Sequence, residues 1–368
     1  MNPKPTTKSI STEALFQPLH LPRGPVIKNR LALAPLTNTQ SNPDGTLSED
    51  EYHFLCLRAR GGFGWVNTCA SHVQANGQGF PGQLGCFDDV HLPGLQRLAT
   101  GLRAEGSVSA MQLQHSGLRA HESVRDVVAP SAHPESGARA LSEDEIDEVI
   151  EAFITAALRA EKSGFDGVQI HGAHGYLIAQ FLSPDTNTRS DRWGGALENR
   201  SRLLFAIIEG IRSRCGANFQ VGVRLSPERF GLRLPEMLTL SAQLLQDERL
   251  DYLDVSLWDI FKQPEDPAYQ GKTLLSLFTD LPRGSIKLGV AGKILSAKDA
   301  LQALDGGADY VALGRAAMLS HDYPLQVQAD AHYLPPALPV SQAYLKKEGL
   351  GPSFLTYLSH RFPGFMAD

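Results

Sequence analysis

The sequence predicts an α/β fold of the (β/α)8 TIM barrel class, in which a closed ring of parallel strands is surrounded by helices. Apolar, strand-like runs alternate with amphipathic, helix-like runs along most of the 368 residues, and this alternation is typical of a parallel sheet. We count eight strand-like runs. Such a barrel needs about 250 residues, so the remaining residues fit into loops and chain ends.

The predicted strands are Arg30 to Leu36, Gly64 to Ala70, Ser107 to Gln114, Gly167 to His171, Phe219 to Leu225, Asp251 to Ser256, Ser285 to Val290 and Asp309 to Leu313. Three segments between them place a hydroxyl at a helix N-cap and a carboxylate three residues later: Ser48 to Glu51, Ser142 to Glu145 and Ser296 to Asp299. The second opens the clearest helix, which carries an apolar stripe from Ile146 to Leu158 and ends at Gly164.

Four longer segments hold the surplus residues: 1–28, 71–90, 115–141 and 257–284. Three of them follow predicted strands, and barrel enzymes carry their sites on the face where the strands end. An open sheet with two lobes remains the structural alternative.

The composition excludes several classes of function. The formal net charge is −6, which gives no sign of a basic surface for nucleic acid. Neither a membrane-spanning run nor a secretory signal is present in the sequence, so we expect a cytoplasmic protein without a membrane partner. The four cysteines Cys56, Cys69, Cys86 and Cys215 form no C-x-x-C pair, which argues for reduced thiols and against structural zinc or iron–sulfur clusters.

The densest group of reactive side chains is His171, His174 and Tyr176, directly after a predicted strand. Glycine and alanine separate these residues and would let a ligand approach the backbone, so three proton-active groups can converge on one bound atom. Two other interpretations stay open. The histidines could hold a metal, which would need a further ligand, or could be hydrogen-bonded within a loop. We expect no metal.

Glycines also follow the last two predicted strands, in Gly289 to Lys293 and in Ala312 to Arg315. Barrels often bind phosphate here through backbone N–H groups, and Arg315 could clamp it. Ordinary turns are the alternative. Residues 77–82 match G-x-G-x-x-G in spacing, but Pro81 interrupts the motif, so we predict no Rossmann site.

Thr37, Gln112 and Arg224 stand at three predicted strand ends. Together they would place a hydroxyl, an amide and a guanidinium around one barrel mouth. Such a set could hold the polar edges of a planar heterocycle.

Four motifs resemble the old yellow enzyme family of flavin oxidoreductases. They are Lys28 to Thr37, His171 to Pro184, Ser190 to Arg200 and Ala308 to Arg315. The resemblance runs from about residue 14 to about residue 325. It implies a single FMN-binding TIM-barrel domain over residues 1–368, with 326–368 as a C-terminal extension.

The resemblance also assigns the cofactor residues. Non-covalent FMN would contact Ala34, Pro35, Leu36 and Thr37 along the ring, Gln112 and Arg224 at the pyrimidine edge, and Gly292, Gly314 and Arg315 at the phosphate. Cys69 would lie near the ring as a backbone contact or a core thiol, and Gln114 would form part of the substrate wall. Many bacterial relatives carry cysteine and tyrosine where this chain has Thr37 and Thr39.

The implied reaction is a ping-pong reduction of an electron-poor alkene. NADH or NADPH would reduce FMN and leave, and an α,β-unsaturated carbonyl or nitro compound would then accept hydride from the flavin. His171 and His174 would bind the substrate oxygen, and Tyr176 would donate a proton.

Three rivals stay open: a flavin-free barrel lyase or isomerase acting on a phosphorylated substrate, a non-catalytic flavin-binding or ligand-binding barrel, and a dehydrogenase of the same family. The amphipathic segment from Ser353 to Phe362 either caps the barrel or contacts a second copy in a homo-oligomer.

Overall fold

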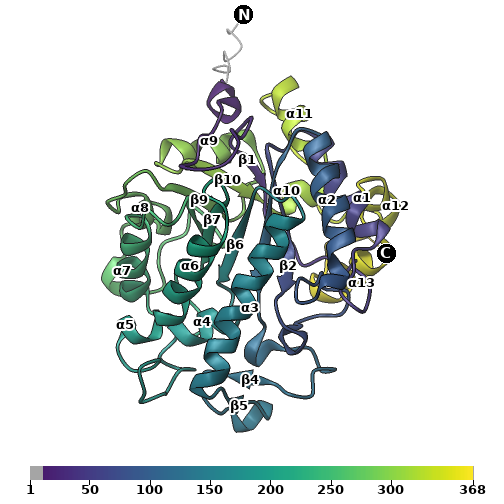
Figure 1. The fold of residues 1–368 in the computed structure, drawn as a ribbon. Coiled ribbons are helices and arrows are strands. Elements are labelled where there is room, and N and C mark those ends of the chain that lie inside the picture. Colours follow the sequence, from purple (N-terminus) through teal and green to yellow (C-terminus); the bar gives the residue numbers. More distant parts are fainter. Residues whose placement is uncertain (1–10, 368) are drawn as a thin grey trace, which may run out of the picture.

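The computed structural model describes residues 11–367, and its centre is a closed barrel of eight parallel strands (Figure 1). The strands are β1 (Leu31–Leu33), β2 (Trp65–His72), β3 (Val108–Gln114), β6 (Gly167–Gly172), β7 (Gln220–Leu225), β8 (Tyr252–Ser256), β9 (Lys287–Ala291) and β10 (Tyr310–Leu313). Ala32 of β1 pairs with Trp65 on one side and with Ala312 on the other. The barrel prediction is therefore confirmed, and the open-sheet alternative is wrong.

Helices surround this ring. They are α1 (Glu49–Arg60), α2 (Leu92–Ala104), α3 (Glu143–Lys162), α4 (Leu177–Leu182), α5 (Leu197–Arg200), α6 (Arg202–Arg214), α7 (Leu234–Leu244), α8 (Leu274–Thr279), α9 (Ala297–Asp305), α10 (Arg315–Leu319), α11 (Tyr323–Ala329), α12 (Gln342–Lys347) and α13 (Pro352–Arg361). Short 3₁₀ segments occupy Glu13–Phe16, Ala75–Gly77, Asp89–His91, Gly117–Arg119, Pro134–Ser136 and Pro267–Tyr269.

The predicted helix starts are present at all three serines. Ser142 and Ser296 form reciprocal capping boxes with the carboxylates three residues on. Ser48 caps α1 through the N–H of Glu51, but the Glu51 carboxylate turns inward and accepts from Asn38 Nδ2 at 3.0 Å. Burial raises the pKa of Glu51 to about 7, because a low-dielectric environment disfavours the charged form.

Three aromatic rings fill the barrel interior near the strand beginnings. Trp65, Tyr252 and Tyr310 are each the first residue of a strand, and the Trp65 ring centroid lies 4.5 Å from Tyr252 and 5.2 Å from Tyr310. Gly222 and Gly289 make room for them, since a Cβ at either glycine would come within 2.1 Å of a tyrosine ring. Within the barrel, room for a ligand is consequently left only at the opposite end, where the strands terminate.

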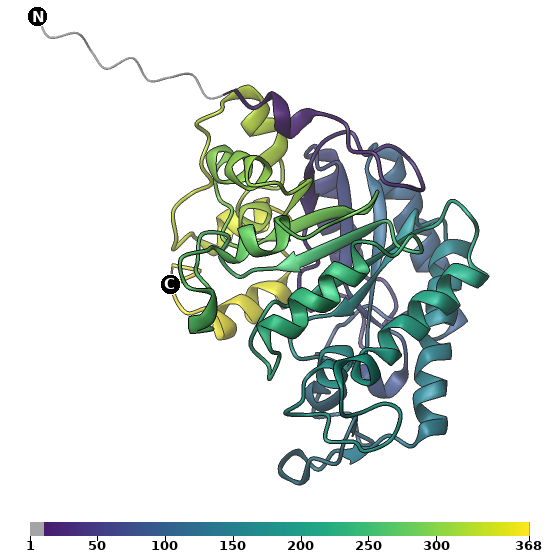
Figure 2. The same ribbon diagram turned by 90° about the vertical axis from the view of Figure 1, so that its left-hand side faces the viewer.

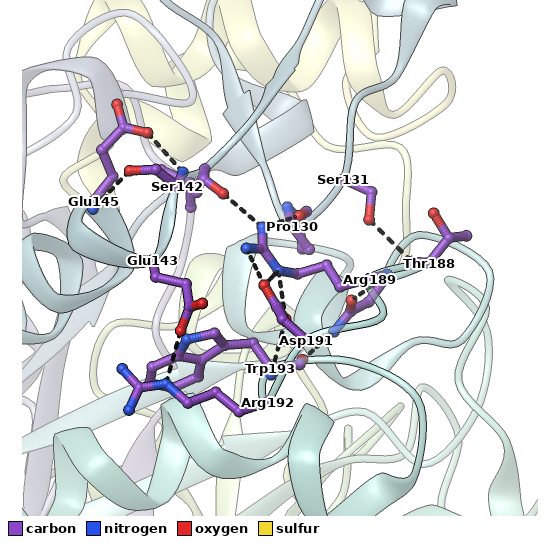
Figure 3. A network of polar contacts seen from close by, with 12 residues as sticks. Pro130, Ser131, Ser142, Glu143, Glu145, Thr188, Arg189, Asp191, Arg192 and Trp193 are labelled. Atoms are coloured by element: carbon purple, nitrogen blue, oxygen red, sulfur yellow. Dashed lines mark hydrogen bonds and ion pairs between the residues drawn. The ribbon is translucent and has the colours of Figure 1, made fainter.

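The loop after β3 contains a two-stranded sheet, β4 (Val128–Ala129) and β5 (Arg139–Ala140), which the sequence reading missed. A polar network ties this loop to the motif Ser190 to Arg200 (Figure 3). Arg189 donates to the carbonyls of Pro130 at 2.7 Å and Leu141 at 2.6 Å, and its guanidinium pairs with Asp191. These polar side chains therefore anchor a loop and do not reach the barrel mouth.

The C-terminal helices lie on one side of the barrel, shown in yellow in Figure 2. Helix α13 packs against α1, with the rings of Phe54 and Phe354 5.5 Å apart. The Thr39 hydroxyl donates to the Ser353 carbonyl at 3.1 Å. These contacts bring α13 beside the barrel mouth.

Candidate active site

A cavity of about 520 Å³ opens at the end of the barrel where the strands terminate, a size typical of small-molecule sites. Twelve of the residues predicted from the sequence line it: Ala34, Pro35, Leu36, Thr37, Gln112, His171, His174, Tyr176, Arg224, Gly292, Gly314 and Arg315. Residues from distant parts of the chain thus line one cavity.

Two predicted site residues do not line this cavity. Cys69 packs in the outer core, and burial raises the pKa of its thiol well above the ordinary value; its neighbour Ala70 lines the cavity instead. Gln114 is fully buried, because its amide accepts from Gln83 Nε2 and donates to Ser116 Oγ, both at 2.8 Å. Gln114 therefore lies behind the residues that line this cavity, and the Cys69 thiol packs in the core.

The two histidines form a hydrogen-bonded pair at the end of β6. His171 Nε2 lies 3.3 Å from His174 Nδ1, and His174 Nε2 lies 2.9 Å from Ser256 Oγ on β8. His174 has a left-handed backbone with φ of 59°, and its N–H donates to Ser226 Oγ at 3.0 Å. The two histidines are therefore hydrogen-bonded to each other, as one of the sequence interpretations expected. Both residues also line the cavity.

Burial keeps both imidazoles neutral. It lowers the pKa of His174 to about 3 and that of His171 well below its ordinary value, and the positive charges of Arg224 and Arg119 add to the effect. Each ring consequently has one N–H and one lone pair at neutral pH. Neutral imidazoles can donate hydrogen bonds to a ligand oxygen.

Tyr176 forms the N-cap of α4, and its ring centroid lies 5.2 Å from that of His171. Burial raises the pKa of the phenol, which therefore stays protonated at neutral pH. The Arg119 guanidinium lies 5.1 Å from the ring centroid and donates to the His174 carbonyl at 2.9 Å. The geometry thus places a proton source beside the two imidazoles.

A buried polar chain underlies the opposite wall. Gln112 donates to Gln169 at 2.7 Å, and Gln169 donates to Asp254 at 3.3 Å. Asp254 in turn lies 3.4 Å from Arg224 Nε. Arg224 is 4% exposed, and its Nε has no hydrogen-bond partner among the described residues. A cation held in this way suits a ligand that is electron-rich at this edge.

The glycine turns after β9 and β10 form a third part of the site. Gly292 has φ of 153°, and a Cβ there would come within 2.6 Å of the Asp259 nitrogen. A Cβ on Gly314 would meet only Leu36, at 3.3 Å. Arg315 is exposed and borders the cavity. This combination of close backbone and an accessible guanidinium fits a phosphate group.

The C-terminal extension forms a further wall of the cavity, which was not predicted from the sequence. Phe354, Tyr357, Leu358 and Arg361 of α13 line the cavity, followed by Phe362 and Phe365. Helix α13 therefore caps the barrel, as one of the two sequence interpretations expected. Trp258, 44% exposed and also lining the cavity, was missed as well. Its left-handed φ of 64° has no signal in the local sequence.

Residues 11–367 contain neither a candidate metal cluster nor a candidate membrane-spanning helix. No cluster of three or more histidine, cysteine, aspartate or glutamate side chains in this range could hold a metal ion. No helix in the same range has both the length and the apolar character needed to cross a membrane. All four cysteines are free and buried.

Comparison with known proteins identifies the chain's relatives. Residues 14–332 match the model of the NADH:flavin oxidoreductase / NADH oxidase family. The chain belongs to this family. The probable NADH-dependent flavin oxidoreductase YqiG of Bacillus subtilis is 38% identical over 341 residues, which cover 89% of each chain. The NADH:fumarate oxidoreductase of Klebsiella pneumoniae is 33% identical over 338 residues, which cover 87% of this chain but 36% of that protein.

Among solved structures, the old yellow enzyme homologue from Zymomonas mobilis superposes with a TM-score of 0.78 at 27% identity, covering 90% of this chain and 96% of that one. The resemblance to the old yellow enzyme family is thereby confirmed. This family of oxidoreductases uses FMN, with NADH or NADPH as the reductant. The cavity fits that cofactor, because a cation at one edge and a glycine-lined anion cradle at the other match its two polar ends.

Proposed function

We propose that this protein reduces the activated C=C bond of α,β-unsaturated carbonyl or nitro compounds, with FMN as cofactor and NADH or NADPH as a transient reductant. One observation carries the proposal. Two neutral imidazoles and a protonated phenol line the same cavity as a buried arginine. Bound FMN would supply the hydride.

The imidazoles bind the substrate oxygen in this proposal. N–H groups of His171 and His174 would donate to a carbonyl or nitro oxygen, withdraw electron density from the conjugated alkene and stabilise the charge that develops on that oxygen. Their position in a largely buried site strengthens these hydrogen bonds. Because both rings stay neutral, neither would protonate the substrate at neutral pH.

Tyr176 serves as the proton donor. Its ring centroid lies 5.2 Å from that of His171, and burial favours the neutral form of the phenol. A positioned acid typically contributes 10²- to 10⁴-fold to the rate. The proton would go to the substrate carbon next to the carbonyl or nitro group.

The cofactor contacts follow from the two polar ends of the cavity. Arg224 and Gln112 would hold the pyrimidine edge, with Arg224 stabilising the negative charge of the reduced form. Gly292, Gly314 and Arg315 would hold the phosphate. Residues 34–37 would lie along the ring.

One relative's name supports the substrate class. The matching part of the Klebsiella pneumoniae protein belongs to an NADH:fumarate oxidoreductase, and fumarate is an electron-poor alkene. Since this chain spans about a third of that protein, the similarity supports the chemistry and does not identify the substrate.

The test is an anaerobic two-step titration of the purified, FMN-loaded protein. NADH or NADPH should bleach the flavin absorbance, and 2-cyclohexenone should restore it with formation of cyclohexanone. A flavin that no nicotinamide reduces would support a non-catalytic barrel. Reduction without reoxidation by any enone or nitroalkene would contradict alkene reduction, and flavin reduction by cyclohexanone would favour the dehydrogenase direction. Turnover of a phosphate ester without FMN would favour a lyase or isomerase.

A further inference from the structure

The hydrogen bonds around the histidine pair fix the position of the ring proton on His171. The backbone N–H of Ala173 donates to His171 Nδ1 at 3.4 Å. A backbone N–H can only donate, so Nδ1 must offer its lone pair. Neutral His171 therefore carries its single ring proton on Nε2, the atom that faces His174.

His174 has two arrangements that agree with the distances. In the first, its Nδ1 accepts from His171 and its Nε2–H donates to Ser256 Oγ. In the second, its proton is on Nδ1, and the Ser256 hydroxyl donates to the bare Nε2. The first arrangement satisfies both rings with nothing bound, but it leaves no imidazole N–H free for a ligand.

The second arrangement has a different consequence. His171 Nε2–H and His174 Nδ1–H, whose nitrogens are 3.3 Å apart, would then both lack an acceptor. Two facing donors repel one another unless an oxygen with two lone pairs accepts from both. A substrate carbonyl or nitro oxygen meets that requirement.

We propose that Ser256 is a positioning residue that switches the tautomer of His174: its hydroxyl accepts from Nε2–H in the empty site and donates to Nε2 when a substrate oxygen is bound. The inference rests on the proposed function, since it requires the histidine pair to bind that oxygen. A hydroxyl suits this role because it both donates and accepts. Solvent water entering through the cavity opening accepts the proton from Nε2 and delivers one to Nδ1, so His174 stays neutral and the site takes up no net proton.

The burial of the pair supports this assignment. Only a neutral imidazole has a choice of tautomer, and burial lowers the pKa of His174 to about 3. Ser256 is itself buried, 8% exposed, and lines the cavity on the side of the pair. Ser226 also contacts His174, but its hydroxyl accepts from the backbone N–H of His174, so this hydrogen bond does not depend on the ring tautomer.

The first test locates the ring proton by nitrogen NMR of FMN-loaded protein labelled with ¹⁵N-histidine, with and without phenol. The phenol oxygen takes the place of the substrate oxygen, and spectra of His171 and His174 variants assign the signals. We expect the His174 N–H on Nε2 without phenol and on Nδ1 with phenol. An N–H that stays on Nε2 with phenol bound would overturn the role of Ser256. If neither histidine responds to phenol, the proposed function itself fails.

The second test compares variants by the same spectra and by phenol affinity. Ser256→Ala removes the hydrogen-bond partner of Nε2 from the empty and the bound site alike, so phenol affinity should change by less than about threefold. The His174 proton should no longer be fixed on one nitrogen, and the spectra without and with phenol should each contain both tautomers. Ser256→Thr retains the hydroxyl and should behave as wild type. Ser226→Ala is the matched control and should keep the wild-type tautomer. Wild-type spectra in Ser256→Ala would contradict the inference. The wild-type spectra decide the question even if this variant folds poorly.

Discussion

Replacing His174 with asparagine tests whether this neutral, buried imidazole makes the free energy of unfolding depend on pH. Asparagine tolerates the left-handed φ of 59° at this position better than most residues. The pKa of His174 is about 3 in the folded protein, against an ordinary value of 6.5. As the pH falls below 6.5, the unfolded chain binds a proton that the folded protein refuses, so stability decreases.

The size of this effect follows from the two pKa values. At pH 5 the histidine of the unfolded chain is mostly protonated and that of the folded protein is not, which lowers the free energy of unfolding by about 2 kcal/mol relative to pH 7.5. His174→Asn lacks this contribution. The difference in stability between the two pH values should therefore be smaller in the variant by about 2 kcal/mol.

The assay is urea unfolding of wild type and variant at pH 7.5 and pH 5, with FMN saturating. His53 is an exposed histidine on α1, and His53→Asn should show the wild-type difference. The reasoning would be refuted if the free energy of unfolding changed by the same amount between pH 7.5 and pH 5 in His174→Asn and in wild type. That result would mean that His174 titrates alike in the folded and unfolded states.

Three other substitutions test separate parts of the site. Tyr176→Phe should leave flavin reduction by NADH nearly unchanged and slow reoxidation by 2-cyclohexenone at least 10²-fold; equal losses in both stopped-flow half-reactions would contradict a proton-donor role. Arg315→Gln should weaken FMN binding tenfold or more, because a charge-assisted hydrogen bond contributes about 1.5–3 kcal/mol; an unchanged Kd in fluorescence titration would remove Arg315 from the phosphate site. Asp254→Asn leaves Arg224 without its counter-charge and should lower the free energy of unfolding by about 3 kcal/mol, as measured by urea denaturation; a stability equal to wild type would show that the pair contributes nothing.

The barrel was predictable because each strand is marked by a short apolar run between punctuating residues, and closure requires only their number and order. The strand ends were less accurate. The first was predicted to extend to Leu36, but its ladder ends at Leu33, since residues 34–37 leave the barrel to line the cavity. A local pattern does not distinguish a residue that continues a strand from one that leaves it.

The proposed catalytic group was predictable for a related reason. His171, His174 and Tyr176 are close in sequence and follow a strand, so local geometry alone brings them together. The sequence did not predict that Cys69 and Gln114 lie outside the cavity lining, because their surroundings depend on distant contacts. The pairing of β2 with β3 shifts register between Asn67 and Ala70, and Gln114 is engaged by Gln83 from another loop.

The cap formed by α13 could not be derived from its own residues. Its amphipathic pattern fits a barrel cap, which the sequence favours, and also a subunit contact. The choice is made by packing across the chain, where Phe354 meets Phe54 of α1 and the Ser353 carbonyl meets Thr39. Contacts over such separations leave no periodic signal in a single sequence.

The central claim is that FMN and the substrate oxygen share this one cavity. The most direct measurement is a crystal structure of the FMN-loaded protein soaked with phenol. The account predicts the flavin ring in the cavity with its pyrimidine edge at Arg224, and the phenol oxygen within hydrogen-bond distance of both His171 Nε2 and His174 Nδ1. A flavin bound elsewhere, or a phenol oxygen that avoids the two imidazoles, would contradict it.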